Sequence, residues 1–481
     1  MEPPYAAGVH SASREYTDTK LTMEGSIPTW LSGTLLRNGP GQFQIGETQV
    51  THWFDGLAYL RQYSVANGEI TFSSRFLQSK EYESVQRHNV LYRDQFGTNT
   101  GRSNLRRLYT TLRGGVTDNC VVNIDRCGKT GAVVALTETT NAVMVDPQSL
   151  ETQREITRFP DIDITGAIAH VQYDFDRHTV LTLGYRFGRH SAYVLIETEY
   201  DTQNSRVVTT IPVHQPAYIH SFTITPTHII VTEPPFRFSP TRALCGHPFK
   251  DCFTFDETAS TRFFVIDREQ KALVATVETA SMFVFHHVNA YNQNKMEIVV
   301  DLIAYENPEI IDRLTLRNLR TGESKIPAGQ LIRYRLNLES ETVDRTLLHA
   351  DPIEFPTIAY RSYNGQPYRY LYAAGNTENP PHGIQNRIQK IDTNTGAVTQ
   401  WSATGTFVGE PLVVEHPEGA AEEDCILLVP IMDVDAEQSG LVVLSGTDLS
   451  ELGRGMLPTT IPFGFHGQFY TDENTQQRSM A

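Results

Sequence analysis

Short apolar runs of the β-strand type recur along the whole chain, and they constrain its fold more than any other feature. The runs are rich in Val, Ile, Thr, Tyr and Phe, as in GAVVALTET, SAYVLIETEY and GLVVLSG, and turn sequences such as ANGE, RTGE and TNTG separate them. Helical periodicity is scarce, and its best candidate is the short stretch from Pro308 to Leu319. The pattern predicts an all-β chain. Many short strands over this length favour a β-propeller over a sandwich, with roughly seven blades of about 65 to 70 residues.

Composition indicates a single soluble domain that covers residues 1–481. No linker-like change of composition divides the chain. The net charge of −16 argues against a nucleic-acid partner, because neutralising phosphates requires clustered Lys and Arg. The odd count of five cysteines predicts reduced thiols, the polar N-terminus resembles no signal peptide, and no apolar run reaches the roughly 18 to 20 residues that span a membrane. We therefore expect a cytoplasmic protein.

Two segments differ from the strand pattern and predict inserted loops. Residues 233–255 mix Pro, Phe and basic residues without strand alternation, and residues 93–116 are polar and rich in Gly and Arg. Either segment could form a lid or a surface patch. Composition by itself favours the simpler alternative, an ordinary solvated loop.

Four histidines lie where the sequence reads as the end of a strand. They are His170 in AIAHVQYD, His220 in AYIHSFTI, His286 in FVFHHVNAY and His466 in FGFHGQFY. The chain has 16 histidines, and a lone histidine in a strand is more often a hydrogen-bonded core residue than a ligand. A fold that brought these four together would build a metal site made entirely of imidazoles.

Three glutamates lie in equally apolar stretches. Glu138 is in VVALTETTN, Glu354 in DPIEFPTIAY and Glu410 in TFVGEPLVV. A buried carboxylate is costly unless it is hydrogen-bonded or paired. If these carboxylates accept from the N–H groups of metal-binding imidazoles, they fix the tautomer and orientation of each ring. The alternative, favoured slightly by the residues alone, is that they are half-exposed and face solvent.

His287 directly follows His286, and only one of the two can enter a shared site. Adjacent residues of a strand point to opposite faces of its sheet. The neighbouring residues Phe285, Val288 and Asn289 do not decide between them.

Seven segments together resemble the carotenoid cleavage oxygenases, in that family's order and over nearly the whole chain. Taken together they are specific, although a single one, such as the DG turn in HWFDGLAYL, would be weak. The histidine segments are closer to the animal-type and retinal-forming branches than to the plant branch. The matching segments are LSGTLLRNGPGQF (31–43), HWFDGLAYL (52–60), TDNCVVNI (117–124), FVFHHVNAY (283–291), EFPTIAYRSYNGQPYRYLYA (354–373), GEPLVV (409–414) and PFGFHGQFY (462–470).

The resemblance implies a seven-bladed β-propeller with helices and long loops that form a cap over one face. It implies one Fe(II) on the propeller axis, held by four histidines with no coordinated carboxylate. The matching positions are His170, His220, His286 and His466 for the iron, with Glu138, Glu354 and Glu410 behind them. The resemblance implies that His170 lacks a glutamate, and its segment AHVQYD departs from the family's usual H-P-H or P-H-x-D forms.

The residue types suit the implied chemistry. Imidazole suits iron, whereas carboxylate sites suit Mg²⁺ or Ca²⁺. Four neutral ligands leave up to two positions of an octahedral shell open for dioxygen, whereas a closed tetrahedral zinc site would leave none. Family members cleave a conjugated C=C bond of a polyene in a shaped tunnel. Phe54 and Phe285 are candidates to line this tunnel, with plain core packing as the alternative.

The resemblance therefore implies a non-haem Fe(II) dioxygenase that cleaves a carotenoid or apocarotenoid, and we expect cleavage at the central 15,15′ bond to give retinal. The alternatives are a stilbene-cleaving oxygenase or a retinoid isomerase of the same family, and a non-catalytic propeller that serves as a binding scaffold. Because the substrate is a lipid, we also expect transient contact with a membrane surface through residues 233–255, whose apolar residues are Phe236, Phe238, Leu244 and Phe249.

Overall fold

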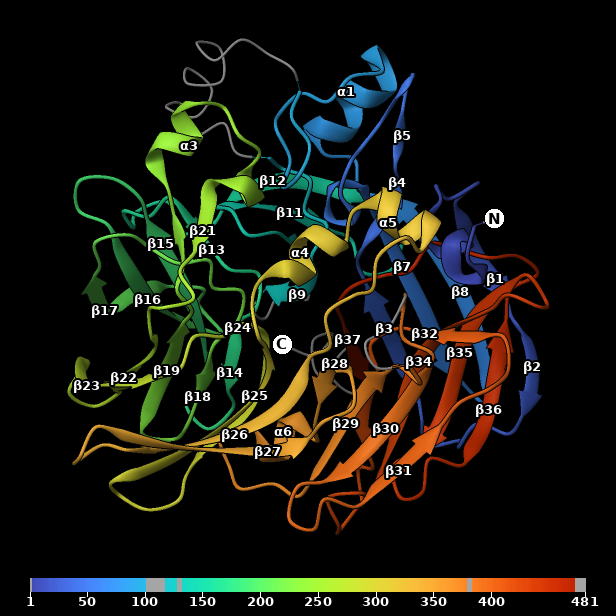
Figure 1. The fold of residues 1–481 in the computed structure, drawn as a ribbon. Helices are drawn as coiled ribbons and strands as arrows, with labels where there is room; N and C mark the ends of the chain where they lie inside the picture. Colours follow the sequence, from blue (N-terminus) through green and yellow to red (C-terminus); the bar gives the residue numbers. More distant parts are fainter. Residues whose placement is uncertain (1, 101–116, 128–131, 379–382, 472–481) are drawn as a thin grey trace.

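The computed structural model of this chain describes residues 2–100, 117–127, 132–378 and 383–471. Seven sheets of four to six strands stand around a common axis (Figure 1). The structure confirms the predicted all-β fold, a seven-bladed propeller. We number the blades along the chain, from the sheet that contains β3 and β7 to the sheet that contains β34 and β35.

The first four blades take their strands mostly from the N-terminal half of the chain. Blade 1 contains β1 (Tyr16–Lys20), β3 (Gly33–Arg37), β4 (Pro40–Gln42), β7 (Leu57–Ala66), β8 (Glu69–Phe76) and β37 (Gly467–Thr471), and blade 2 contains β9 (Asn123–Cys127), β10 (Ala132–Leu136), β11 (Asn141–Val145) and β12 (Thr152–Thr157). Blade 3 contains β13 (Gly166–Ala167), β14 (Gln172–Asp174), β15 (Thr179–Arg186), β16 (Ala192–Glu199) and β17 (Ser205–Pro212), and blade 4 contains β18 (Thr223–Ile224), β19 (His228–Glu233), β22 (Thr261–Asp267) and β23 (Ala272–Thr279).

The other three blades complete the ring. Blade 5 contains β24 (Phe283–Asn292), β25 (Glu297–Tyr305), β26 (Gln330–Asn337) and β27 (Thr342–His349), and blade 6 contains β28 (Ile353–Thr357), β29 (Tyr370–Gly375), β30 (Arg387–Asp392) and β31 (Val398–Trp401). Blade 7 contains β2 (Thr22–Gly25), β32 (Thr406–Val408), β33 (Leu412–Glu415), β34 (Cys425–Asp433), β35 (Gln438–Ser445) and β36 (Glu451–Met456).

Burial changes in a regular way from the middle of each blade to its outer edge. Middle strands are buried on both faces because neighbouring blades pack against them, and they read as continuous apolar runs such as CILLVPIMD in β34. The outer strands β12, β17 and β27 are largely exposed. The innermost strands of neighbouring blades contact one another around the axis, as β24 does with β18 and β28.

Both ends of the chain take part in closing the ring. Near the N-terminus, β2 pairs with β36 and so belongs to blade 7. Near the C-terminus, β37 pairs with β3 of blade 1, with Arg37 opposite Gly467 and Gly33 opposite Thr471. Each junction covers a sheet edge that would otherwise be open for pairing with another chain.

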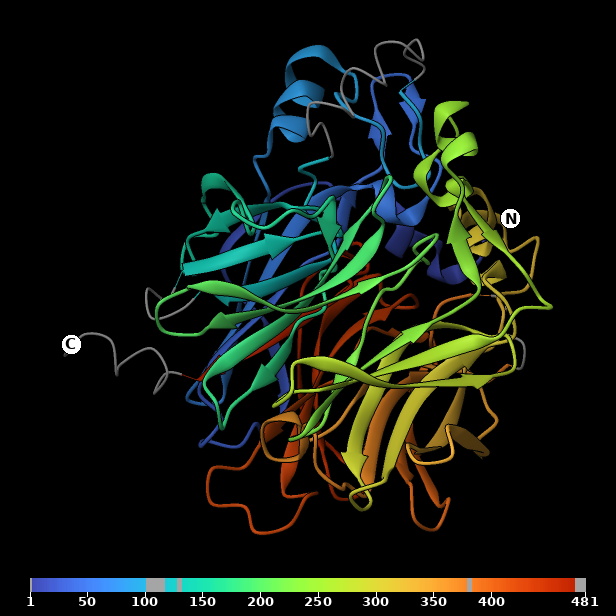
Figure 2. The ribbon, with the colours of Figure 1, turned by 90° about the vertical axis from the view of Figure 1, so that its left-hand side faces the viewer.

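Helices and hairpins form a cap on one side of the ring, as the resemblance implied, and Figure 2 shows part of it projecting at the top of the view. The cap elements are η1 (Pro4–Val9), β5 (Gln44–Ile45), β6 (Thr48–Gln49), η2 (Trp53–Asp55), α1 (Lys80–His88), β20 (Phe236–Phe238), α3 (Pro240–Leu244), η4 (Phe249–Cys252), β21 (Phe253–Phe255), α4 (Glu309–Arg313) and α5 (Leu316–Thr321). One further helix, α6 (Tyr360–Tyr363), follows β28 in blade 6.

The helix expected from Pro308 to Leu319 is present, but it is divided into two short helices, α4 and α5. The division falls at Thr315, which is the N-cap of α5 and whose side chain accepts from Asn318 N–H. The segment predicted as an insertion at residues 233–255 does separate β19 from β22, but it is not an ordinary loop, since β20 and β21 pair as a hairpin around α3 and η4. Residues 93–100 have no regular structure, and residues 101–116 lie outside the described residues.

No helix among the described residues combines the length and hydropathy needed to cross a membrane. Among the cysteines whose side chains the structure describes, Cys120, Cys245 and Cys425 are free thiols.

Candidate metal centre

The four histidines singled out from the sequence lie in or next to the innermost strands of four different blades. His170 lies between β13 and β14, His220 precedes β18, His286 is within β24 and His466 directly precedes β37. Because innermost strands meet around the axis, residues that are far apart in the sequence become neighbours there. The propeller topology thus brings together side chains from blades 1, 3, 4 and 5.

The four imidazoles form a compact cluster. Each offers one ring nitrogen, and these four atoms all lie within 4.8 Å of one another. The Nε2 atoms of His170 and His220 are 3.0 Å apart, and the ring centroids of His170 and His466 are 4.4 Å apart. These distances allow one metal ion to contact all four rings.

Each of the three glutamates accepts a hydrogen bond from one histidine. Glu138 Oε1 lies 2.5 Å from His220 Nδ1, and Glu354 Oε2 lies 2.5 Å from His286 Nδ1. Glu410 Oε1 lies 2.7 Å from His466 Nδ1. The carboxylates therefore hold the proton on Nδ1 and leave Nε2 as the nitrogen free to bind a metal.

Each of the seven blades supplies one residue of the cluster, either a histidine or a glutamate. Blades 1, 3, 4 and 5 supply the histidines, and blades 2, 6 and 7 supply the glutamates. Glu354 reaches back from blade 6 to blade 5, and Glu410 reaches forward from blade 7 to blade 1. Glu138, in the turn between β10 and β11, reaches past blade 3 to His220 in blade 4. His170 in blade 3 has no carboxylate partner among the described residues.

Burial and the neighbouring charges set the ionisation of these groups. Burial, and then the adjacent imidazoles, hold the pKa of His170 well below its usual value, and burial lowers the pKa of His466 in spite of Glu410. Burial works to lower the pKa of His286, but the Glu354 carboxylate outweighs it and raises this pKa. Burial works to raise the pKa values of Glu354 and Glu410, but their histidine partners lower both. Metal binding requires neutral imidazole, which is the form that His170 and His466 favour.

The donor set fits a transition metal. His286 Nε2 is buried, and no described residue gives it a hydrogen-bond partner. A buried polar atom without a partner is costly, and a metal ion between the rings would remove that cost. Imidazole nitrogen suits iron, copper, nickel or zinc, and the absence of a coordinating carboxylate disfavours Mg²⁺ and Ca²⁺.

His287 points away from the cluster, as expected for the residue next to His286 in a strand. Its Nδ1 lies 2.8 Å from Ser221 Oγ, and its Nε2 lies 2.7 Å from Thr232 Oγ1. Burial lowers the pKa of His287 to about 3. With hydroxyl partners at both nitrogens, His287 has no nitrogen left for a metal.

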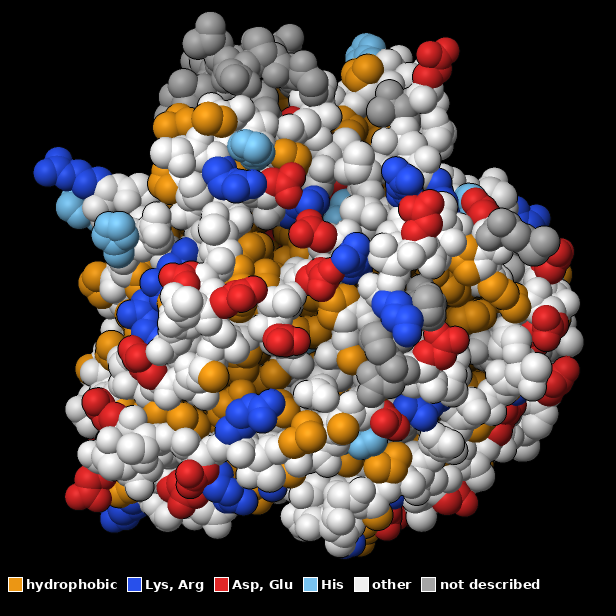
Figure 3. All heavy atoms as spheres, viewed as in Figure 1, with side chains coloured by type: hydrophobic (Ala, Val, Ile, Leu, Met, Phe, Trp, Pro, Cys, Tyr) orange, Lys and Arg blue, Asp and Glu red, His pale blue; other side chains and the backbone are white. Residues whose placement is uncertain are grey.

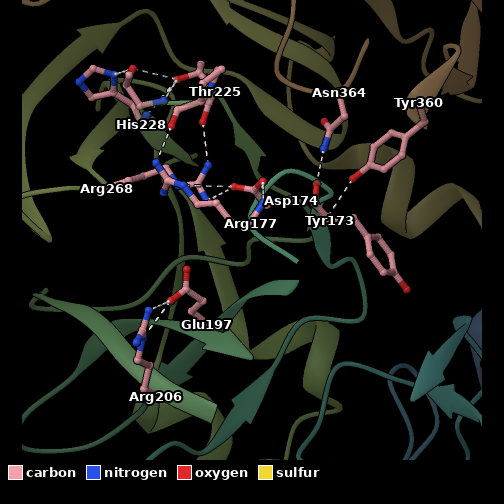
Figure 4. Close-up of polar contacts among 12 residues, drawn as sticks. Tyr173, Asp174, Arg177, Glu197, Arg206, Thr225, His228, Arg268, Tyr360 and Asn364 are labelled. Atoms are coloured by element: carbon pink, nitrogen blue, oxygen red, sulfur yellow. Dashed lines mark hydrogen bonds and ion pairs between the residues drawn. The ribbon is translucent and has the colours of Figure 1, made fainter. Parts of the chain in front are cut away.

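The strand that follows His170 is held by residues that sequence reasoning did not identify (Figure 4). Tyr173 N–H donates to Tyr360 Oη at 3.1 Å, and Asn364 Nδ2 donates to the Tyr173 carbonyl at 2.9 Å. Asp174 pairs with the buried guanidinium of Arg268. Tyr360 and Asn364 lie within one of the family-like segments, but nothing in the sequence links them to a residue about 190 positions earlier.

An apolar cavity of about 560 Å³ adjoins the cluster on the cap side. His220, His286 and His466 line it, together with the two predicted residues Phe54 and Phe285. Sequence reasoning missed its other aromatic wall residues, because only the fold reveals which aromatic side chains of the core face an empty space. These are Trp53, Tyr92, Phe96, Tyr185, Phe187, Tyr218, Tyr305, Phe355 and Phe465.

Residues 233–255 form part of the wall and edge of this cavity. Phe238, Leu244 and Phe249 line it, whereas Phe236 is buried in the core. Leu244 is 66% exposed and Tyr92, another lining residue, is 42% exposed. Figure 3 shows hydrophobic side chains within a hollow near the middle of the face that it presents.

Comparisons with known proteins agree with this geometry. The family model described as "Retinal pigment epithelial membrane protein" matches residues 9–471. The mouse protein named beta,beta-carotene 15,15′-dioxygenase is 30% identical, over 93% of this chain and 88% of the relative. The mitochondrial carotenoid-cleaving dioxygenase of Macaca fascicularis is also 30% identical, over 92% of this chain and 90% of its own length.

Solved structures of apocarotenoid oxygenase have the same fold over almost the whole chain. A mutant of the Synechocystis enzyme superposes with a TM-score of 0.86 at 27% identity and covers 98% of this chain and 99% of that one. The cobalt-substituted Synechocystis enzyme gives 0.85 at 27% identity, over 97% and 98%. Since the family model and the relatives span nearly its full length, this chain belongs to the retinal pigment epithelial membrane protein family of carotenoid oxygenases.

Proposed function

We propose that this chain is a non-haem Fe(II) dioxygenase that cleaves a C=C double bond of a carotenoid or apocarotenoid, at the central 15,15′ position, to give retinal. The observation that carries the proposal is a four-imidazole cluster at the wall of an apolar cavity. The cavity volume of about 560 Å³ lies within the range typical of small-molecule sites. The names of the mammalian relatives support the reaction and the bond.

In this proposal His170, His220, His286 and His466 hold Fe(II) through one nitrogen each. Bound Fe(II) supplies open coordination positions at which dioxygen can be activated. Glu138, Glu354 and Glu410 keep the Nδ1 protons of their partners in place, so that three rings keep one tautomer and one orientation.

The cavity walls position the substrate and exclude water. Phe54 and Phe285 lie with ring centroids 6.4 Å apart, and Phe54 also meets Phe465 edge-to-face at 5.3 Å. Rigid rings packed on one another form a wall of fixed shape, which suits a long conjugated chain. We propose that this wall places one double bond of the polyene beside the histidine cluster.

We also propose transient contact of the cap with a membrane surface, through residues 233–255. Exposed Leu244 and Tyr92 at the cavity edge support this proposal, because a lipid substrate must enter from an apolar phase. We further propose that residues 1–481 act as one domain, since β2 and β37 bind both ends of the chain into the same ring.

The central experiment supplies substrates to the protein loaded anaerobically with Fe(II). Separate samples receive β-carotene, an apocarotenal, a stilbene and a retinyl ester, and products are separated by chromatography after air is admitted. We expect aldehydes from the polyenes in air and none under nitrogen, with retinal as the product from β-carotene. Products from the stilbene alone indicate stilbene cleavage, and conversion of the retinyl ester without dioxygen indicates isomerase activity. No product from any substrate, with Fe(II) bound, contradicts the dioxygenase.

The metal assignment is tested separately by elemental analysis. We expect His220→Ala to lose iron and activity together, because it removes one of the four nitrogens. His287→Gln is the matched control, since His287 directly follows the clustered His286 but its two ring nitrogens bond to Ser221 and Thr232. A His220→Ala protein with the iron content of the wild type would favour a non-catalytic scaffold.

A further inference from the structure

Two arginines are buried side by side in blade 1, where the mechanism above does not use them. Arg37 on β3 is 1% exposed and Arg61 on β7 is 2% exposed, and the two are paired in the strand register. Removing a guanidinium from water is expensive unless good partners replace the water. The identity of those partners indicates what the two charges do.

Arg37 contacts two residues that adjoin His466, namely Glu410, which bonds to its ring, and Phe465, which precedes it in the chain. Its Nη1 donates to the Glu410 carbonyl at 3.1 Å and lies 3.3 Å from the Glu410 carboxylate oxygen Oε2. Its Nη2 donates to the carbonyl of Phe465, the residue before His466. One planar guanidinium therefore hydrogen-bonds the backbone of Glu410 and of Phe465. It also forms an ion pair with the Glu410 carboxylate, whose Oε2 has no hydrogen bond among the described residues.

Arg61 extends the same support further back along the chain. It donates to the carbonyls of Pro462 at 2.9 Å and Phe463 at 3.3 Å. Residues 461–466 form no helix or strand. Asn38 N–H donates to the His466 carbonyl at 2.9 Å. The two guanidiniums donate to other carbonyls of this irregular segment and so help to hold the chain that leads to His466.

The pair of His466 and Glu410 also differs in its surrounding charge from the other two histidine–glutamate pairs. Of the three glutamates, Glu410 is the one that pairs with a guanidinium among the described residues. The Glu354 carboxylate accepts instead from the neutral Tyr305 hydroxyl, at 2.8 Å. A carboxylate that shares its charge with a cation withdraws the Nδ1 proton less strongly, so His466 is a weaker electron donor than His286.

We propose that Arg37 is a positioning residue of the metal centre. It holds Glu410 and the Phe465 carbonyl so that His466 Nε2 points at the metal, and it makes His466 the least electron-rich ligand of the three that have carboxylate partners. This inference rests on the proposed function, in that the four histidines bind Fe(II). It extends that function by one residue that touches neither metal nor substrate.

The test compares Arg37→Met and Arg37→Lys with the wild-type protein in the Fe(II) form. We expect Arg37→Met to bind iron at least ten-fold more weakly and to give a nitric oxide adduct with an altered electron paramagnetic resonance spectrum. We expect its kcat to fall more than ten-fold while KM changes less than two-fold, because Phe465 is the one wall residue whose carbonyl Arg37 holds and the other walls are unchanged. Arg37→Lys keeps the charge but not the two-point contact, and should recover part of each loss.

Arg333→Met is the matched control, because Arg333 is also buried and binds Asp301 at 2.8 and 2.9 Å in blade 5 without touching the site. It should destabilise the fold and leave the spectrum and the iron affinity unchanged. Arg37→Met that behaves in the same way overturns the proposal.

A double variant tests the coupling directly. If Arg37 acts through Glu410, Arg37→Met should cost much less iron affinity in a Glu410→Gln protein than in the wild type. Equal costs in both backgrounds overturn the proposal. If Arg37→Met does not fold, Arg37→Lys decides, and a wild-type spectrum and iron affinity in that variant count against it. A wild-type protein that binds no iron refutes the proposed function instead.

Discussion

Three of the four clustered histidines are held by a side chain, and the fourth is held through its backbone. His220, His286 and His466 each donate to a glutamate. His170 has no such partner among the described residues, and its flanking strands β13 and β14 have only two and three residues. The contrast shows that a propeller can orient an axial side chain in two ways, by a carboxylate behind the ring or by anchoring the strand beside it.

The strand anchor of His170 combines the ion pair of Asp174 with Arg268 and several neutral hydrogen bonds. Tyr360 accepts from Tyr173 N–H and donates to Gln172 Oε1, both at 3.1 Å, while Gln172 Nε2 donates to the Phe222 carbonyl at 2.7 Å. These bonds link blade 3 to blades 4 and 6. Because several contacts hold this strand, losing one neutral hydrogen bond should lower metal affinity less than losing a carboxylate behind a histidine ring.

The largest expected effect comes from removing a ring from either group. His286→Ala and His170→Ala should each lower bound iron to less than about a tenth of the wild-type content, because each removes one of four nitrogens. Iron is measured by elemental analysis after desalting. If His170→Ala keeps full iron, the backbone-held histidine is not an equal member of the cluster, and the comparison fails.

A second, smaller effect is expected from Glu354→Gln. A neutral amide oxygen accepts the hydrogen bond from His286 Nδ1 more weakly than a carboxylate does, so the His286 ring is held less firmly and becomes less basic. Metal affinity should therefore fall by about 10- to 100-fold. Competition with a chelator measures the affinity. Glu451→Gln is the control, because Glu451 pairs with Arg454 near the surface, and it should leave the affinity unchanged. If Glu354→Gln binds metal as tightly as the wild type, the carboxylate behind a ring does not distinguish His220, His286 and His466 from His170.

Tyr360→Phe should have a weaker effect still. It deletes the hydroxyl that bonds Tyr173 N–H and Gln172, and a neutral hydrogen bond contributes about 0.5–1.5 kcal/mol. We expect metal affinity to fall by about 2- to 10-fold, as measured with the same chelator. A loss as large as that of Glu354→Gln would mean that the strand anchor is as important as a carboxylate.

The smallest effect is expected at the outer edge of blade 3. Arg206 on β17 pairs with Glu197 but is 59% exposed (Figure 4). Arg206→Met should change the free energy of unfolding by less than about 1 kcal/mol in denaturant titration, and leave iron binding unchanged. This variant sets the baseline for the other three, and any change in its iron content would show that the measurement responds to general loss of stability.

The sequence supports the propeller and the choice of four histidines because both depend on local patterns and on ordered family-like segments. It does not show which glutamate meets which histidine, since Glu138 reaches His220 past a whole blade. It also hides the hairpin within residues 233–255, because β20 and β21 have only three residues each. Arg37 reads as an ordinary residue of a strand, and only the long-range fold reveals what its guanidinium contacts.

The way the ring closes has a consequence for biosynthesis. His466 immediately precedes β37, the last described strand, and that strand completes blade 1, which the chain began near its other end. A nascent polypeptide can present His170, His220 and His286 long before His466 leaves the ribosome. The complete four-imidazole cluster therefore arises only after His466 has emerged and β37 has paired with β3 to close the ring. Binding of an ion by all four nitrogens, in this view, follows ring closure.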